Sequence, residues 1–344
     1  MAEFFLDYGL FFAKAVTVVA AIAAVMVLFI AAASRKEHSP DGLRVEKLND
    51  KYRAMADTVR RAVMNKSEWR QKHRRDKKAR KEKEKSGKGG QQTGKRIFVI
   101  NFRGDMRATG VTALREEVSA VATVASDQDE VVVCLENAGG TVHEHGLAAS
   151  QLLRLKDRKI PLTVIVDKVA ASGGYLMAAV ADRLIAAPFA IIGSIGVLAQ
   201  LPNFNRFLES HGIDFEQITA GKYKRTLSLF GKNTEEDRAK MKEELEDVHE
   251  LFKAVVAEHR PLLDVDSIAT GEYWYGSRAK QVGLVDELGS SDDYLMKAAE
   301  TADIYSVRYK GRSTLLQRLQ SAMTSMFNSV GFELPGGRDE YHRF

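Results

Sequence analysis

Short apolar runs alternate with segments of helical periodicity through the middle of the chain. The runs RIFVINF, VVVCLE and LTVIVD have the length and composition of buried strands, and the stretches between them repeat apolar side chains every three or four positions. Such alternation predicts parallel strands covered by helices, with a site where loops leave the strand ends. A later apolar stretch is interrupted by Asp182, Arg183 and Pro188. There we expect a buried helix followed by a buried strand, and not a membrane span.

The amino-terminal region carries a long uncharged run. Residues 15–34 contain no charged side chain, and as a helix they would extend about 30 Å, the thickness of the hydrocarbon core of a bilayer. Glu3 and Asp7 precede the run, so an uncleaved transmembrane helix is predicted rather than a signal peptide. The basic residues Arg35 and Lys36 that follow it favour a cytoplasmic location for the rest of the chain, by the positive-inside rule. A periplasmic location stays open.

Residues 35–94 are predicted to form an amphipathic and basic helical arm that ends in a linker. Apolar residues recur at helical spacing at Val45, Leu48, Tyr52, Met55, Val59 and Val63. This stripe has two interpretations, a coiled-coil-like surface for self-association or a helix that packs on its own domain. The segment from Lys66 to Lys88 is strongly basic and has one aromatic residue, Trp69, so anionic lipid headgroups are expected as its partner and nucleic acid is not. Residues 86–94 are expected to be flexible.

Composition is ordinary for a globular protein, with 45% hydrophobic and 28% charged residues and a net charge of +5. A length of 344 residues favours one catalytic core with appended segments. We therefore predict a core domain at 95–310, followed by an amphipathic helix and tail at 311–344. A helix is expected to begin at Asn233-Thr234 and to end before Pro261. The single cysteine, Cys134, excludes an internal disulfide and leaves the redox compartment open.

Candidate chemistry gathers at three expected strand exits, in the segments ENAGGTV, DKVAASGGYLMAAVAD and TAGKYKRTL. Ser172 follows one strand closely and directly precedes a predicted helix. The N–H of Gly173 beside it could stabilise an oxyanion, and Gly139-Gly140 could supply a second donor. Alternatively, Ser172 is a simple helix N-cap and the glycines form turns. The local pattern leaves both interpretations open.

A serine nucleophile needs a general base. His143 and His145 have no evident acidic partner and lack the zinc-binding H-E-x-x-H spacing, so we expect polar surface residues there and no metal site. A lysine acts as a base only where a dry environment favours its neutral form. Lys224 follows FEQITAG, an expected strand, and is the best candidate.

These segments resemble the signal peptide peptidase A family of Ser-Lys proteases, and the anchor with its basic arm resembles the SohB branch of that family. The resemblance covers about residues 95–300, in the blocks ASGGYLMAAVAD, IIGSIGV, GKYK and GSRAKQVGLVDELG. It implies that Ser172 is the nucleophile and Lys224 the base, with Lys222 as a neighbour and Ser194 orienting the lysine. Ala138 stands where the family usually has a proline before the glycine pair, which bears on the stiffness of that loop.

The resemblance further implies a ClpP- and crotonase-like α/β fold of repeated ββα units. It implies ring-like homo-oligomers whose neighbouring subunits can jointly complete each site, polypeptide substrates such as signal-peptide remnants, and no cofactor. Two alternatives remain: a catalytically inactive membrane-tethered scaffold of the same fold, and a crotonase-type acyl-CoA enzyme. The latter would need neither Ser172 nor Lys224.

Overall fold

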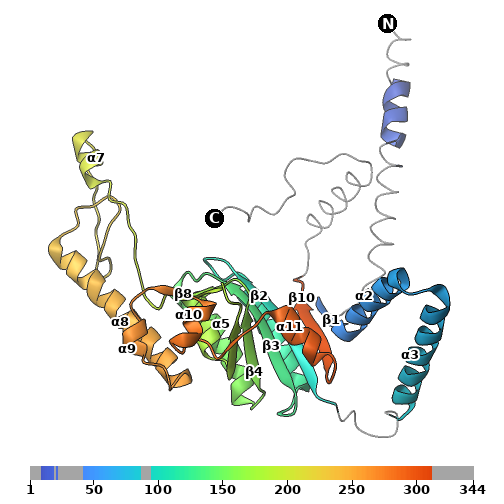
Figure 1. Ribbon diagram of the computed structural model, residues 1–344. Coiled ribbons are helices and arrows are strands. Elements are labelled where there is room, and N and C mark those ends of the chain that lie inside the picture. Colours follow the sequence, from blue (N-terminus) through green and yellow to red (C-terminus); the bar gives the residue numbers. More distant parts are fainter. Residues whose placement is uncertain (1–8, 19–20, 22–41, 87–93, 312–344) are drawn as a thin grey trace. The chain divides into compact units, whose positions relative to one another are not determined.

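The computed structural model describes residues 9–18, 21, 42–86 and 94–311 (Figure 1). The chain divides into two compact units, Met1–Leu43 with Lys310–Phe344, and Arg44–Tyr309. In the first unit, residues 9–18 are helical and exposed. Most of the expected membrane helix, the linker and the carboxy-terminal helix lie outside the described residues. Among the helices that are described, none combines the length and apolar character that a membrane span requires.

The second unit is a mixed α/β structure built on a ten-stranded sheet, counted over the described residues. The main path runs in the order β1-β10-β2-β3-β4-β6-β9. These strands are β1 (Leu43–Lys47), β10 (Asp303–Tyr309), β2 (Arg96–Gly104), β3 (Glu130–Asn137), β4 (Leu162–Val166), β6 (Arg183–Ala186) and β9 (Glu287–Leu288). The pairs from β10 to β9 are parallel.

The central strands and their covering helices match the alternation predicted from the sequence. All five residues of β4 are buried, as expected for a parallel strand covered on both faces. The helices between the central strands are α4 (Val111–Val124), α5 (Val142–Asp157) and α6 (Gly173–Ala179). They bury the apolar faces that their periodicity marked, with Leu114, Val118 and Leu152 at most 1% exposed.

A short second branch of the sheet positions the loops of interest. It consists of β5 (Val169–Ala171), β7 (Ile191–Gly193) and β8 (Tyr273–Tyr275). β5 pairs with the end of β3 and with β7, and β8 runs antiparallel to β7. The succession β4, β5, α6 is one ββα unit. Because β5 and β7 are parallel and in register, the residues that follow them emerge side by side at one edge of the sheet.

The predicted amphipathic stripe of the arm divides between two elements. Val45 lies in β1, and helix α2 (Leu48–Val63) begins at Leu48, so the prediction of one continuous helical stripe was wrong at its start. The first turn of α2 packs on its own domain, where the buried Asn49 side chain donates to the carbonyl of Ala302 and accepts from the N–H of Ile304. Tyr52, one turn later, is also packed against the core, whereas Met55, Val59 and Val63 of the stripe are exposed. The basic segment forms α3 (Lys66–Ser86), as expected.

A long segment with little regular secondary structure precedes the remaining helices. Residues 197–234, here called the α7 segment, contain the short helix α7 (Asn205–Ser210) and lead to α8 (Glu235–His259). FEQITAG, residues 215–221, forms no strand. That prediction was wrong because apolar residues there pair with no sheet edge: Ile218 is 94% exposed. α8 begins at the predicted place, with Thr234 and Asp237 forming a capping box. The short helices α9 (Val265–Ile268), α10 (Gly276–Gln281) and α11 (Ser291–Ala298) complete the unit.

Glu117 gives the folded unit a testable pH dependence. It is buried on α4, where its Oε1 accepts a hydrogen bond from the N–H of Tyr309 at 2.7 Å. Burial raises the pKa of Glu117 from 4.5 to about 7. The folded state therefore holds this proton more tightly than the unfolded chain, so stability falls as the pH rises between those two values.

Glu117→Gln keeps the hydrogen-bond acceptor and removes the charge. We expect it to raise the free energy of unfolding by about 1–2 kcal/mol at pH 8 and by much less at pH 5. Denaturant unfolding at the two pH values measures this. The exposed neighbour Glu116→Gln serves as a control and should change neither value appreciably. An equal effect of Glu117→Gln at both pH values would contradict the raised pKa.

Candidate active site

Ser172 occupies the turn that joins β5 to α6. Its backbone is in an unusual conformation for a residue with a side chain, with φ 51° and ψ −122°. Its N–H donates to the carbonyl of Gly193 at 2.8 Å, which holds the turn against β7. Although Ser172 is the N-cap of α6, its side chain makes no capping hydrogen bond. The simple N-cap interpretation therefore does not explain the hydroxyl.

The strain at Ser172 has a known functional counterpart. A non-glycine residue at positive φ typically costs about 1–3 kcal/mol, and such residues concentrate at active sites. A serine on a sharp, strained strand-to-helix turn is the arrangement that exposes the nucleophile in α/β hydrolases. Here the arrangement occurs without the G-x-S-x-G sequence. The half-buried Ser172 hydroxyl is thus presented at the amino end of a buried helix.

Gly139 touches Ser172 directly across the two strand exits. A Cβ on Gly139 would lie 2.7 Å from the Ser172 Cβ and 2.9 Å from the nitrogen of Gly173, and the glycine has φ +90°. Neither the space nor the backbone conformation admits another residue. The glycine pair and the serine turn are therefore in contact, as residues of one site must be.

The three predicted oxyanion donors are not equivalent. The N–H of Gly139 donates to the Asn137 side-chain oxygen at 2.9 Å and is already engaged. Gly173 is the first residue of α6, where N–H groups have no acceptor within the helix. Across the described residues we find no acceptor for the N–H of Gly140 either. The donors available to an oxyanion are those of Gly173 and Gly140, and Gly139 instead supplies the close approach.

Ser194 lies beside Ser172 at the exit of β7. Ala171 and Gly193 are register partners, so the two serines follow adjacent positions of paired strands. Ser194 also has positive φ, 53°. Its N–H donates to the carbonyl of Glu272 at 2.6 Å. The structure thus brings Ser172, Ser194 and the glycines to one edge of the sheet.

Lys224 lies apart from this cluster. It is exposed on the α7 segment, where its N–H donates to the carbonyl of Gly221 at 3.2 Å. In the described part of the chain, no hydrogen bond joins Lys224 to Ser172 or Ser194. Among the described residues, therefore, nothing gives Lys224 the dry environment that a lysine base requires.

Lys222, the other lysine of GKYK, is engaged with other groups. Its ammonium forms an ion pair with Glu236 at 2.9 Å and lies over the Tyr223 ring. The hydrogen bond with Tyr223 and the Glu236 carboxylate raise the pKa of Lys222, which favours the charged form. A protonated lysine cannot accept a proton, so Lys222 is the poorer candidate for a general base.

Comparison with known proteins places these features in a family. A model of the amino-terminal region of peptidase family S49 matches residues 3–152, and a model of peptidase family S49 matches residues 154–305. The chain is 43% identical over 332 residues to the probable protease SohB of Haemophilus influenzae, covering 94% of each protein. The chain belongs to peptidase family S49.

Other relatives of this S49 peptidase carry the same name. The probable protease SohB of Buchnera aphidicola from Acyrthosiphon pisum is 50% identical over 230 residues, which is 67% of this chain and 68% of the relative. Its counterpart in Buchnera aphidicola from Schlechtendalia chinensis is 41% identical over 302 residues, 86% of this chain and 99% of the relative. The resemblance to this family inferred from the sequence is confirmed.

The S49 peptidase contains a buried histidine that sequence reasoning misplaced. His145 was expected at the polar surface, yet it is fully buried, whereas His143 is exposed. The reason is helical geometry: the two residues fall on different faces of α5, and the face of His145 turns toward Gly173. Asn137, at the end of β3, is buried beside it and was also not singled out. In the sequence, only the glycines that pack against these two side chains could have indicated their burial.

Two other features of the S49 peptidase are separate from this site. Burial raises the pKa of Cys134 to about 12, so the thiol stays protonated and is a poor nucleophile.

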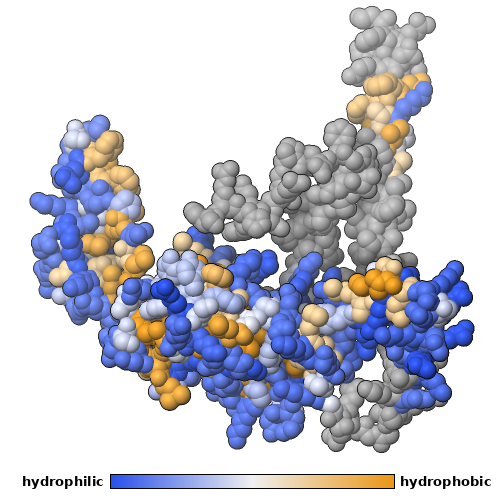
Figure 2. All heavy atoms as spheres, in the orientation of Figure 1, coloured by the Kyte–Doolittle hydropathy of each residue, from blue (hydrophilic) through white to orange (hydrophobic). Residues whose placement is uncertain are grey.

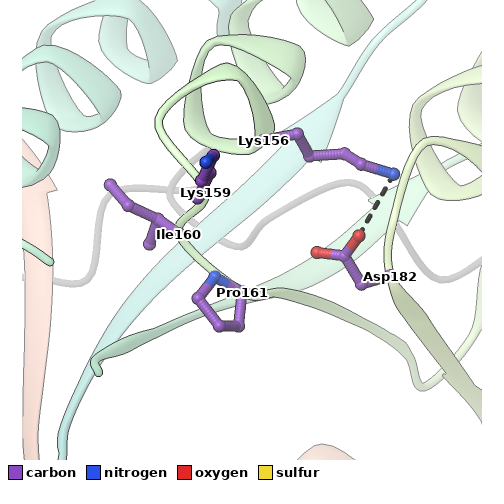
Figure 3. A pocket seen from close by; sticks show the side chains of 5 residues that line it. All are labelled: Lys156, Lys159, Ile160, Pro161 and Asp182. Carbon is purple, nitrogen blue, oxygen red and sulfur yellow. Dashed lines mark ion pairs between the residues drawn. The ribbon is translucent and has the colours of Figure 1, made fainter. Parts of the chain in front are cut away.

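A pocket of about 340 Å³ is lined by Lys156, Lys159, Ile160, Pro161 and Asp182 (Figure 3). An ion pair of 3.1 Å joins Lys156 to Asp182. Because this pocket precedes β4, it lies at the amino ends of the strands, opposite the edge that carries Ser172.

Proposed function

We propose that this S49 peptidase is a membrane-anchored serine endopeptidase with Ser172 as nucleophile and Lys224 as general base. The observation that carries the proposal is Ser172 itself, which has a strained backbone, makes no capping hydrogen bond with its side chain and lies against Gly139. The N–H groups of Gly173 and Gly140 are available beside it. These groups fit acyl transfer, in which a nucleophile and oxyanion donors converge on one carbonyl. The ββα unit around Ser172 fits the ClpP- and crotonase-like architecture expected from the sequence.

In the proposed reaction, the neutral amine of Lys224 takes the proton of the Ser172 hydroxyl. At the same time the Ser172 oxygen forms a bond to the scissile carbonyl carbon. The electron pair of the C=O bond moves onto oxygen, where the N–H groups of Gly173 and Gly140 stabilise the charge. The Lys224 ammonium then protonates the leaving nitrogen as the C–N bond breaks, which leaves an acyl ester on Ser172. Water then attacks the ester carbonyl carbon and gives a proton to Lys224. The bond between that carbon and the Ser172 oxygen breaks, Lys224 returns the proton to the serine oxygen, and the new carboxyl terminus leaves.

Lys224 in this proposal comes from a neighbouring copy of the chain. The α7 segment exposes many apolar side chains, which gather along one side of it (Figure 2). They are Leu198, Leu201, Phe204, Phe207, Ile213, Phe215, Ile218, Tyr223, Leu229 and Phe230. An exposed apolar surface of this extent is typical of protein–protein contacts. A second copy packed on it would exclude water around Lys224, and Ser194 beside Ser172 would orient the incoming amine.

The proposed substrate and location are based on the uncharged run near the amino terminus and on the family of the chain. The uncharged run at 15–34 supports a single membrane anchor, and the charge rule favours a cytoplasmic catalytic unit. A protease tethered at a bilayer meets apolar polypeptides there. We therefore propose remnants of signal peptides and unfolded membrane-associated segments as substrates, with nucleic acid not expected and no cofactor required.

Covalent labelling tests the proposal on the full-length protein in detergent micelles. A fluorophosphonate probe should modify Ser172, and mass spectrometry of the digested protein locates the adduct. The same preparation should cleave a synthetic peptide that carries the hydrophobic core of a signal sequence. Absence of both labelling and cleavage would instead favour the alternative of a catalytically inactive membrane-tethered scaffold.

A further inference from the structure

A buried polar pair stands directly behind the proposed oxyanion site. His145 is 0% exposed and Asn137 is 1% exposed, unusual values for polar side chains. The imidazole Nδ1 lies 2.9 Å from the Thr141 carbonyl oxygen, and Nε2 lies 3.2 Å from the Asn137 Oδ1. Both ring nitrogens therefore face oxygen acceptors, and the ring can donate at either end. Buried polar groups with such definite partners specify one local arrangement.

Asn137 connects this pair to the glycine loop. Its Oδ1 accepts the N–H of Gly139 at 2.9 Å as well as facing His145. Its Nδ2 lies 3.3 Å from the sulfur of Met177 on α6, so the side chain spans from the loop to the helix. The loop needs this restraint. Gly139 and Gly140 have positive φ, 90° and 159°, and glycines lose more conformational freedom on ordering than other residues.

His145 also contacts the second oxyanion donor. A Cβ on Gly173 would lie 2.4 Å from Cγ of the His145 ring, so the ring lies flush against the backbone of that glycine. Gly174 packs equally closely, because a Cβ there would lie 2.1 Å from the Asn137 carbonyl oxygen. One hydrogen-bonded pair thus contacts both segments that carry the available N–H groups, the Gly139-Gly140 loop and the start of α6.

We propose that His145 and Asn137 are positioning residues that hold the N–H groups of Gly140 and Gly173 at the separation an oxyanion requires. Neither side chain touches substrate: both act through the glycines. This inference rests on the proposed function for its catalytic consequence. Its physical basis is that oxyanion stabilisation depends on donors fixed before the reaction, and a displacement of about 1 Å can cost about 100-fold in rate.

The test compares variants of Asn137 in the full-length protein. Asn137→Leu removes the acceptor for the Gly139 N–H, whereas Asn137→Asp retains it. We expect Asn137→Leu to lower kcat for a signal-peptide-like substrate about 100-fold with KM changed less than about twofold. Asn137→Asp should recover most of kcat. A KM that rises with unchanged kcat would overturn the assignment, because the pair would then bind substrate and not the transition state.

A matched comparison on α5 separates hydrogen bonding from packing. His145→Phe keeps an aromatic ring against Gly173 and loses the ring N–H that donates to one of the two facing oxygens, while His145→Gln keeps a donor toward Asn137. The phenylalanine variant should lose kcat as Asn137→Leu does, and the glutamine variant should retain more. His143→Phe, at an exposed position two residues earlier, should leave kcat unchanged. Equal kcat in His145→Phe and the unmodified protein would refute a role for the hydrogen bonds.

Amide hydrogen exchange measures the restraint without relying on turnover. Peptides that cover residues 138–141 should exchange faster in Asn137→Leu and His145→Phe than in the unmodified protein, with peptides of α4 unchanged. Unchanged exchange at 138–141 would overturn the inference even if activity fell. If the unmodified protein showed no Ser172-dependent cleavage while exchange rose in both variants, the proposed function would fail and the positioning pair would stand.

Discussion

Ser172→Ala is expected to lower kcat for peptide cleavage by about 10⁴-fold or more and to abolish fluorophosphonate labelling. The hydroxyl is the atom that forms the acyl bond, and the oxyanion donors alone leave little residual catalysis. The fold should be retained, because the Ser172 side chain makes no capping hydrogen bond to α6 and alanine meets the same backbone strain. Steady-state kinetics and the thermal unfolding midpoint, measured on one preparation, test both statements.

Ser150→Ala provides the control for this experiment. Ser150 is an exposed serine on α5 whose hydroxyl donates to the Gly146 carbonyl within the same helix. Its replacement should leave kcat and labelling unchanged. Cleavage by Ser172→Ala at the rate of the unmodified protein would show that another residue is the nucleophile, and the mechanism proposed for this edge of the sheet would then be abandoned.

Lys224→Ala is expected to lower kcat by about 10²–10⁴-fold, the usual contribution of a general base. Lys222→Ala should have a much smaller effect, because Lys222 is held as a cation by its partners Tyr223 and Glu236. The two lysines lie on the same exposed segment and are separated by one residue, so their variants form a matched pair. If Lys222→Ala were the more damaging variant, the roles of the two lysines would be reversed.

Mixing two inactive variants tests where Lys224 acts. Subunits carrying Ser172→Ala retain the lysine, and subunits carrying Lys224→Ala retain the serine. If each serine is served by the lysine of a neighbour, co-assembly in a 1:1 ratio should restore about a quarter of the activity, the share of neighbour pairs in a head-to-tail ring that carry both groups. Co-expression followed by kinetics measures this. A mixture no more active than its components would place serine and lysine in one chain.

Much of the central structure could be predicted from the sequence because its signals are local. The runs that became β2, β3 and β4 are continuous apolar segments between helical patterns, and neighbouring residues alone produce that contrast. The start of α8 was predictable for the same reason, since Thr234 and Asp237 form the capping box within one turn. The strand predicted at 215–221 did not form, because a strand needs a pairing partner and partners are not local in the sequence.

The same distinction applies within the candidate site. Ser172, Gly173, Gly139 and Gly140 were recognised as motif residues, but equal roles were assigned to the glycines. Contacts separate them: the Gly139 N–H is engaged by Asn137, and Gly139 instead provides the space that lets the loop meet the serine. His145 was placed at the surface because its three-residue neighbourhood HEH is polar. Its burial depends on α6, which lies almost thirty positions later in the chain.

The sequence by itself determined the alternating α/β core, the family and the identity of the motif residues, because periodicity and short motifs are properties of neighbouring positions. Tertiary structure alone decided that the Ser172 backbone is strained and that its side chain makes no capping hydrogen bond. It also decided that Ser172 touches Gly139 and lies beside Ser194, and that Lys224 is exposed. These features arise where the exits of β3, β5 and β7 meet. Such meetings depend on strand pairing and packing between distant segments, which a linear pattern does not encode.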